Sequence, residues 1–252
     1  MTKFVGIIPA RYASSRFPGK PLAKLGDSPV IEHVVKRVEK VLEEVYVATD
    51  DERIAEVVTG FGGRPIMTSS NHPSGTDRVM EAYLKSGSNA DVIINIQGDE
   101  PFIAEEQIRL LMSAFDDQNT QIATLARRFD PAAGFDALFD PNLVKLVKDD
   151  KDFALYFSRS IIPYVRGKVW TEWLESADFH THVGIYAYRA DVLDQLTKLP
   201  QSSLEKAESL EQLRWLQSGY KIKVGITDTP TIGIDTPDDL EHAQKYLEEH
   251  DL

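Results

Sequence analysis

Short apolar runs alternate with helical patterns through the first 115 residues, and this alternation constrains the fold more than any other feature of the sequence. Each apolar run is short enough to be a buried strand, and each helical pattern between the runs is long enough to cross over a sheet. Strands that alternate with helices form βαβ units and predict a mostly parallel sheet, whose ligand site lies at the carboxyl ends of the strands. The predicted strands cover 4–8, 45–48, 65–67 and 92–96.

Apolar residues at helical spacing predict the helices, and polar residues ahead of them predict the caps. The predicted N-caps are Asp50 or Asp51, Thr76 or Asp77, and Thr236. The predicted helices cover 30–42, 54–61, 79–84, 105–115, 192–199, 204–217 and 237–249, and the second half adds predicted strands at 144–147, 182–189, 221–226 and 231–234. No repeat or clear linker interrupts the chain, so we expect a single α/β domain over residues 1–252.

Composition excludes several classes of protein. A net charge of −12 argues against general nucleic-acid binding, which needs a basic face. The absence of cysteine excludes disulfides, thiolate catalysis and cysteine-ligated metals. No apolar run is long enough for a signal peptide or a membrane span, so we expect a cytoplasmic protein without membrane insertion.

The segment that contains the loop after the first strand is positively charged, although the net charge of the whole chain is negative. Residues 1–26 contain five basic residues and no acidic one, which indicates an anion site, although a solvated basic loop has the same composition. The loop lacks the spaced glycines of a dinucleotide-binding fingerprint. It is also not a P-loop, because Ser14 replaces the first glycine and Pro21 replaces the Ser/Thr metal ligand. Its arginines, lysine and serines (Ser14 and Ser15) suit a triphosphate.

Two aspartates follow apolar segments near predicted strand ends. Asp99 follows the most apolar strand and lies beside Gly98, where a carboxylate is well placed to hold Mg²⁺ together with phosphate oxygens. Asp235 precedes a helix that begins with proline, so a simple helix cap is the alternative role. From these residues alone a structural role is the better interpretation for each.

The segment from Ile7 to Leu22 (IIPARYASSRFPGKPL) resembles the nucleotide-binding loop of 3-deoxy-manno-octulosonate (Kdo) cytidylyltransferases. Acylneuraminate cytidylyltransferases have Gly-Gly-Ser where this chain has Tyr12-Ala13-Ser14, so the loop favours Kdo. Asp77, Ile234 and Phe17 are mild departures from the usual Glu, Val and Leu. Seven further segments resemble the same family in the family's order: 47–50, 74–78, 95–101, 154–159, 182–186, 210–214 and 233–237.

The resemblance implies a Rossmann-like three-layer nucleotidyltransferase fold, with a mostly parallel mixed sheet and an inserted dimerisation segment. It implies a Mg²⁺-dependent enzyme that transfers CMP from CTP to the anomeric hydroxyl of Kdo and releases pyrophosphate, for lipopolysaccharide biosynthesis. The family is typically homodimeric. The aromatic-rich segment of about 150–185 is therefore our candidate for the interface and part of the sugar site.

Site residues are assigned by the same resemblance. It implies that Asp99 and Asp235 hold the metal, and that Lys20 and Arg11 act with them in catalysis. The implied nucleotide-binding residues are Pro9, Ala10, Arg11, Ser14, Arg16, Lys20, Ser74, Gly75, Thr76 and Gln97. The implied sugar-binding residues are Arg78, Gln97, Arg159, His182, Tyr186 and Glu211, although Arg78 suits either ligand.

Three alternatives remain at this stage. In the first and second, the acceptor is a different acidic sugar: an acylneuraminate or an amino analogue of Kdo. In the third, the chain is a non-catalytic nucleotide-binding module on the same fold. A dehydrogenase is disfavoured because the glycine fingerprint is missing.

Overall fold

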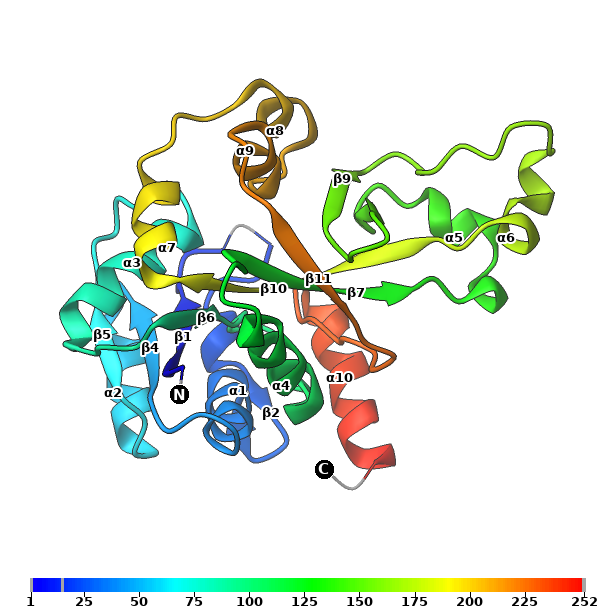
Figure 1. Cartoon of the computed structure of the whole chain (residues 1–252). Helices are drawn as coiled ribbons and strands as arrows, with labels where there is room; N and C mark the ends of the chain where they lie inside the picture. The colour runs from blue at the N-terminus through cyan, green and yellow to red at the C-terminus, as the bar shows by residue number, and fades with distance from the viewer. Residues whose placement is uncertain (1, 15, 251–252) are drawn as a thin grey trace. The chain divides into compact units, whose positions relative to one another are not determined.

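The chain divides into two compact units. Figure 1 labels helices and strands of both. A computed structural model describes residues 2–14 and 16–250, so Ser15 of the basic loop lies outside the described residues. Unit 1 comprises Met1–Arg109, Ala187–Thr197 and Thr231–Leu252, and unit 2 comprises Leu110–Tyr186 and Lys198–Pro230. Each unit is assembled from separate segments of the chain, so no single linker divides them. The sequence predicted one domain because it contains no such linker.

Unit 1 contains a parallel sheet with the strand order β6-β1-β4-β5. Ile7 in its centre is opposite Tyr46 on one side and Asn95 on the other. Strands β1, β4 and β6 are almost entirely buried, as parallel strands covered by helices usually are, whereas the edge strand β5 is partly exposed. The bounds are β1 (Phe4–Ala10), β4 (Val45–Thr49), β5 (Pro65–Met67) and β6 (Val92–Asn95), which confirms the four strands predicted for this half.

Helices follow the strands of unit 1 as the βαβ pattern predicts. Contacts join α1, α2 and α3 to the strands, so these helices cover the sheet and exclude water from it. The helices that lie wholly in unit 1 are α1 (Val30–Glu39), α2 (Glu52–Gly60), α3 (Gly75–Ser86), α7 (Ala190–Thr197) and α10 (Pro237–Glu249), while α4 (Glu105–Ser113) runs across the unit boundary. Unit 1 also has a 3₁₀ turn, η1 (Lys20–Leu22), and a small hairpin of β2 (Lys24–Leu25) and β3 (Ser28–Pro29).

The helix caps agree with the sequence at two of three positions. Asp51 caps α2 by accepting a hydrogen bond from the Arg53 amide, and Thr236 caps α10 in a capping box with Asp239. The prediction that Thr76 or Asp77 caps α3 was wrong. Ser74 is the N-cap, because its hydroxyl oxygen reaches the Asp77 amide and the helix therefore begins one turn earlier.

Unit 2 contains the mixed part of the fold. Its strand order is β11-β7-β10-β8-β9, with β11 parallel to β7, and with β8 antiparallel to both β10 and β9. The strands are β7 (Ile122–Arg128), β8 (Lys145–Lys148), β9 (Ala154–Ser158), β10 (His180–Arg189) and β11 (Ile222–Ile226); the last three residues of β10 belong to unit 1. The helices and 3₁₀ turns are η2 (Ala114–Asp116), η3 (Pro131–Ala133), α5 (Phe135–Phe139), η4 (Trp170–Glu172), α6 (Trp173–Ser176), α8 (Ser203–Glu208) and α9 (Gln212–Gln217).

Three expectations about the second half were wrong or incomplete. The helix predicted at 204–217 is broken into α8 and α9, because Ser209 adopts a left-handed conformation with φ of 52°. Residues 231–234 form no strand. Strands β7 and β9 were not predicted, because their polar and small residues weaken the apolar pattern that identifies a buried strand.

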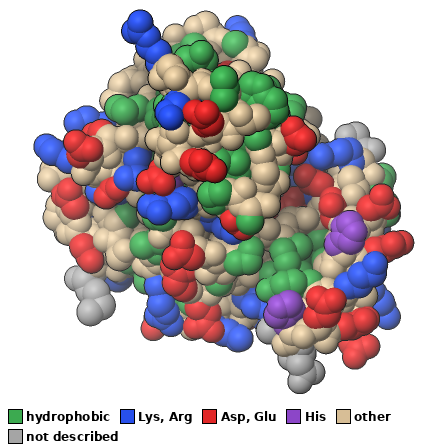
Figure 2. Space-filling model, turned by 90° about the vertical axis from the view of Figure 1, so that its right-hand side faces the viewer, with side chains coloured by type: hydrophobic (Ala, Val, Ile, Leu, Met, Phe, Trp, Pro, Cys, Tyr) green, Lys and Arg blue, Asp and Glu red, His purple; other side chains and the backbone are tan. Residues whose placement is uncertain are grey.

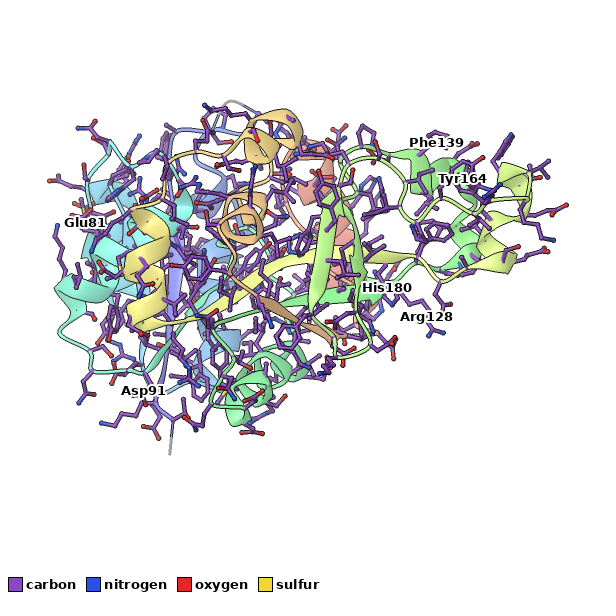
Figure 3. All side chains as sticks on the ribbon, turned by 45° about the horizontal axis from the view of Figure 1, so that its top comes forward. Glu81, Asp91, Arg128, Phe139, Tyr164 and His180 are labelled. Atoms are coloured by element: carbon purple, nitrogen blue, oxygen red, sulfur yellow. The ribbon has the colours of Figure 1, made fainter. Side chains whose placement is uncertain are left out.

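The aromatic segment of unit 2 is only partly buried. Trp173 and Phe179 belong to a small core, whereas Tyr164 and Trp170 are 73% and 54% exposed. Figure 3 labels Tyr164 and Phe139 on the part of the chain that carries α5 and α6. Figure 2 shows one face of the molecule, on which hydrophobic side chains are visible between charged ones. No helix of the described residues is long and apolar enough to cross a membrane.

Candidate active site

A pocket of about 400 Å³ opens where β1 and β6 end in unit 1. This is the edge of a parallel sheet at which ligands usually bind. The loop after β1 forms one wall, and residues 97–99 after β6 form another. The predicted site residues that line the pocket are Pro9, Ala10, Arg11, Ser14, Arg16, Lys20, Gly75, Gln97, Asp99 and Asp235.

Two predicted nucleotide-binding residues do not line this pocket. The Ser74 side chain is used as the cap of α3, where it also donates to the Asp77 carboxylate at 2.5 Å. Thr76 is buried within the first turn of the same helix, with 4% of its surface exposed. Gly75 alone of these three faces the pocket, so the turn contributes main chain and no side chain.

Asp99 and Asp235 lie 136 positions apart in the sequence, and one main-chain hydrogen bond joins their segments. The Ile234 amide donates to the Asp99 carbonyl oxygen at 2.9 Å. Ile234 is fully buried in an apolar cluster with residues of α1 and α10, including Val30 and Leu247. Burial of this cluster therefore anchors α10, and α10 in turn presents Asp235 at the edge of the pocket.

Lys20 lies between the two carboxylates. Its Nζ is 2.5 Å from Asp99 Oδ2 and 3.1 Å from Asp235 Oδ1. Partial burial by itself lowers the pKa of Lys20, but the charges and hydrogen bonds of Asp99 and Asp235 outweigh it and raise the pKa above its usual value. The lysine is therefore protonated at neutral pH, and the two carboxylates converge on one cation.

The arginines of the loop extend the positive charge. The Arg16 guanidinium is 3.1 Å from Asp235 Oδ2, and both side chains are at least half exposed. Arg11 is exposed and forms no ion pair in the part of the chain that the structure describes. Its donors therefore face solvent at the mouth of the pocket, where a polyanion would enter.

The conformation of the loop depends on Arg53, a residue that lies outside every predicted site motif. The Arg53 guanidinium stacks 3.4 Å from the centre of the Tyr12 ring, and Asp51 holds that guanidinium through two side-chain hydrogen bonds. On the other side, the Gly19 amide donates to the Tyr12 carbonyl, and a side chain at Gly19 would meet the Tyr12 ring at 3.0 Å. Tyr12 thus closes the loop on itself, which explains the need for glycine at position 19, where φ is +73°.

Gly98 allows the β1 and β6 loops to approach each other, and this close approach leads to a testable prediction. A Cβ atom at Gly98 would lie 2.8 Å from the Pro9 carbonyl oxygen. We expect Gly98→Ala to displace the end of β1, with overpacking that destabilises the fold by about 1–3 kcal/mol. For a chain of this size the melting temperature should fall by about 2–12 °C.

Gly60→Ala is the matched control, since a Cβ there meets nothing within 4 Å. Thermal unfolding of both variants, followed by circular dichroism, measures the difference. An unchanged melting temperature in Gly98→Ala would show that the two loops can separate without cost.

Arg78 occupies a different environment from the one predicted. Its side chain is fully buried, donating to Thr68 Oγ1 at 2.7 Å and to Asp50 Oδ2 at 3.0 Å. Removing one partner of a buried ion pair is costly, because the other charge is left buried without compensation. The expectation that Arg78 contacts a ligand does not fit this geometry, because the residue tethers α3 to the end of β4.

His182 and Tyr186 of unit 2 lie together on β10. Their ring centroids are 5.3 Å apart, and the His182 ring also meets Phe157 edge-on at 5.2 Å. Burial lowers the pKa of His182 to about 3, so the imidazole is neutral at neutral pH. Its Nε2 is 3.1 Å from the Thr124 hydroxyl, which leaves it as a neutral hydrogen-bonding group.

Arg159 and Glu211 line separate cavities of unit 2. Arg159 borders a space of about 420 Å³ together with aromatic residues Phe139 and Trp173. Glu211 borders a space of about 350 Å³ near the start of α9, 3.6 Å from the Arg214 guanidinium. The structure therefore groups His182 with Tyr186, while Arg159 and Glu211 each border a different space.

The fold and the pocket define a class of protein: an α/β nucleotidyltransferase, with a basic loop and paired carboxylates at the edge of a parallel sheet. The family model for cytidylyltransferases matches residues 5–222. Two 3-deoxy-manno-octulosonate cytidylyltransferases are similar over nearly their whole length. One, from Parabacteroides distasonis, is 60% identical over 98% of this chain and 99% of its own, and one from Phocaeicola vulgatus is 57% identical over 99% of both.

A solved structure with a related function in its name also has the same fold. The structure of CMP:2-keto-3-deoxy-manno-octonic acid synthetase complexed with CTP superposes with a TM-score of 0.91. That protein is 43% identical, and the match covers 99% of this chain and 100% of the other. The chain belongs to the family of 3-deoxy-manno-octulosonate cytidylyltransferases. The predicted α/β nucleotidyltransferase fold with a mostly parallel mixed sheet is thereby confirmed.

Nucleotidyltransferases of this kind typically use a divalent metal ion. Asp99 and Asp235 fit such an ion, because their carboxylate oxygens already converge on the positive charge of Lys20. No cluster of three or more His, Asp or Glu side chains suited to a metal occurs in residues 2–14 and 16–250. Two carboxylates with phosphate oxygens are a donor set that Mg²⁺ accepts, so the pocket suits an ion that arrives with a nucleotide.

Proposed function

We propose that this chain catalyses the transfer of CMP from CTP to the anomeric hydroxyl of Kdo, with release of pyrophosphate. The observation that carries the proposal is the pocket of unit 1, in which Lys20 lies between Asp99 and Asp235 beside a basic loop. The chemistry must bring an anionic sugar to an anionic triphosphate. A site that accumulates fixed positive charge lowers that electrostatic barrier.

In the proposed reaction the anomeric oxygen of Kdo attacks the α-phosphorus of CTP in line with the leaving pyrophosphate. The hydroxyl loses its proton, a new phosphorus–oxygen bond forms, and the bond between the α-phosphorus and the bridging oxygen breaks. Arg11, Arg16 and Lys20 bind the phosphates and stabilise the charge that develops on the leaving group. A divalent metal ion, for which we propose Mg²⁺ held by Asp99 and Asp235, would supply further charge neutralisation.

The remaining site assignments are part of the same proposal. Main chain at Pro9, Ala10 and Gly75, with Ser14 and Gln97, would contact the nucleotide. In unit 2 the neutral His182 and Tyr186 would contact sugar hydroxyls, and Arg159 and Glu211 would complete recognition of the acidic sugar. We also propose that the protein acts in the cytoplasm. We further propose that it forms a homodimer through its exposed aromatic segment, which includes Tyr164 and Trp170.

A pyrophosphate-release assay with CTP and Mg²⁺ tests the proposal against its nearest alternatives. The acceptors are Kdo, an amino analogue of Kdo, and sialic acid. We expect turnover with Kdo to exceed turnover with the other two sugars. Faster turnover with sialic acid would identify an acylneuraminate enzyme instead. CTP binding without pyrophosphate release from any acceptor would indicate a nucleotide-binding module.

A further inference from the structure

The turn between α8 and α9 is held in an unfavourable conformation. Ser209, between the two helices, has a left-handed backbone with φ of 52° and ψ of 47°. Residues other than glycine rarely adopt this conformation, and it persists only where the surrounding structure imposes it. Glu211, the N-cap of α9, is two residues further along the chain. Whatever holds Ser209 therefore also places Glu211.

Glu208 supplies one half of the restraint. Its Oε1 accepts a hydrogen bond from the Ser158 hydroxyl at 2.6 Å, and its Oε2 accepts one from the Arg159 amide at 2.9 Å. Both donors lie at the end of β9, and Ser158 is only 3% exposed. The carboxylate thus fastens the last residue of α8 to the end of a strand. No local pattern marks Glu208, because its partners are about 50 positions away in the sequence.

Arg159 supplies the other half. Its Nε donates to the Glu208 carbonyl at 2.7 Å, its Nη1 to the Pro141 carbonyl at 2.8 Å, and its Nη2 to the Ser209 carbonyl at 3.4 Å. Three of the five guanidinium N–H groups are therefore directed at main chain, and two of these three bonds reach the turn itself. The carbonyl groups of Glu208 and Ser209 fix the orientation of the Arg159 guanidinium, and the same two hydrogen bonds hold the turn in place.

A buried lysine makes the carboxylate of Glu208 more important. Lys145 on β8 is fully buried, and its Nζ donates to the Asp140 carbonyl at 2.9 Å. Burial lowers the pKa of Lys145, while the nearby charges of Asp140 and Glu208 raise it and that of Arg159 lowers it. The Glu208 carboxylate therefore interacts with Lys145 and with the main chain of Arg159, and its negative charge offsets the repulsion between these two cations.

We propose that Glu208 is a positioning residue for the acidic sugar: it locks the α8–α9 turn to the end of β9 and thereby sets the orientation of both Arg159 and Glu211. The inference rests on the proposed function, because it assigns these two side chains to the sugar. It also changes the part played by Arg159. Three of its five N–H donors bond to main chain, two of them at the turn, and only the remaining N–H groups are available to a carboxylate.

Steady-state kinetics of four proteins test the proposal. Glu208→Ala removes both hydrogen bonds, and we expect the KM for Kdo to rise about 10-fold or more, the usual effect of losing a hydrogen bond to a charged group. The KM for CTP should change less than about 2-fold, since the pocket of unit 1 is untouched. Glu208→Gln should recover most of the loss, because the amide oxygen can accept from the Arg159 amide while its NH₂ donates to Ser158. Glu56→Gln, on the exposed surface of α2 in unit 1, is the control.

The split between the two KM values separates positioning from simple loss of fold. A smaller fraction of folded enzyme would lower kcat and leave both KM values unchanged, and this result would overturn the proposal. An equal rise in both KM values would overturn it as well. If Glu208→Ala fails to fold, Ser158→Ala removes one of the two bonds and should raise the KM for Kdo in the same direction; an unchanged KM in that variant would contradict the proposal.

Hydrogen exchange gives a readout that does not depend on turnover. The Arg159 amide donates to Glu208, so its protection should fall at least about 10-fold in Glu208→Ala and remain in Glu208→Gln. If the wild-type chain releases no pyrophosphate with any acidic sugar, the proposed function fails. Exchange then still decides whether Glu208 restrains the turn: unchanged protection of the Arg159 amide in Glu208→Ala would refute the restraint.

Discussion

Replacement of Asp99 or Asp235 by asparagine is expected to reduce turnover with CTP and Kdo by about 100-fold or more, the usual effect of losing an electrostatic catalytic element. Each substitution keeps the shape of the side chain and removes one of the two negative charges that converge on the Lys20 ammonium. With one carboxylate left, a divalent cation would have only half of its protein ligands. The concentration of Mg²⁺ that gives half-maximal turnover should therefore also rise.

Pyrophosphate release measured over a series of Mg²⁺ concentrations gives both the maximal turnover and the Mg²⁺ concentration for half-maximal turnover. Asp238→Asn is the matched control, because Asp238 is an exposed carboxylate in the first turn of α10, three residues from Asp235. Normal turnover in both Asp99→Asn and Asp235→Asn would eliminate the metal site formed by the two aspartates. A loss in only one of them would reduce the site to a single carboxylate.

Replacement of Lys20 by alanine is expected to lower kcat/KM for CTP by about 10- to 100-fold, from the loss of charge-assisted hydrogen bonds worth about 1.5–3 kcal/mol. Asp99 and Asp235 keep the lysine protonated, since they raise its pKa, so the wild-type site presents a permanent positive charge to the phosphates. Without it, two carboxylates would repel the incoming triphosphate and each other.

Lys24→Ala is the control for this variant, because Lys24 is exposed on β2 and lies only four residues away. Kinetics equal to wild type in Lys20→Ala would demote the lysine to a structural partner of the carboxylates. The double variant Lys20→Ala with Asp99→Asn adds a second test. Residues in direct contact are coupled, so the combined loss should differ from the sum of the separate losses.

Local patterns predicted unit 1 well because its strands and helices are continuous and strongly periodic. The run Phe4–Ile8 and the helix Pro237–Glu249 were recognisable from apolar spacing and capping residues alone. The second half was harder. The left-handed Ser209 breaks a helix whose pattern continues across it, and nothing in the local sequence announces this break.

The candidate site was predictable as a set of residues but not as a set of contacts. Family resemblance selected Lys20, Asp99 and Asp235, and the structure brings these three together. Resemblance also selected Arg78, whose guanidinium is buried against Asp50. A family motif contains residues that maintain the fold as well as residues that contact ligands. Only the position of each side chain in the structure distinguishes these two roles.

The sequence by itself determined the alternating α/β pattern, the basic loop after the first strand and the chemical class of the site, because these depend on residue types and short spacings. Only the tertiary structure decided which charges meet. The bond from Ile234 to Asp99 joins segments 135 positions apart, and the Glu208 carboxylate reaches Arg159 across 49. Such contacts depend on the packing of α10 and of the α8–α9 turn, which no local pattern encodes.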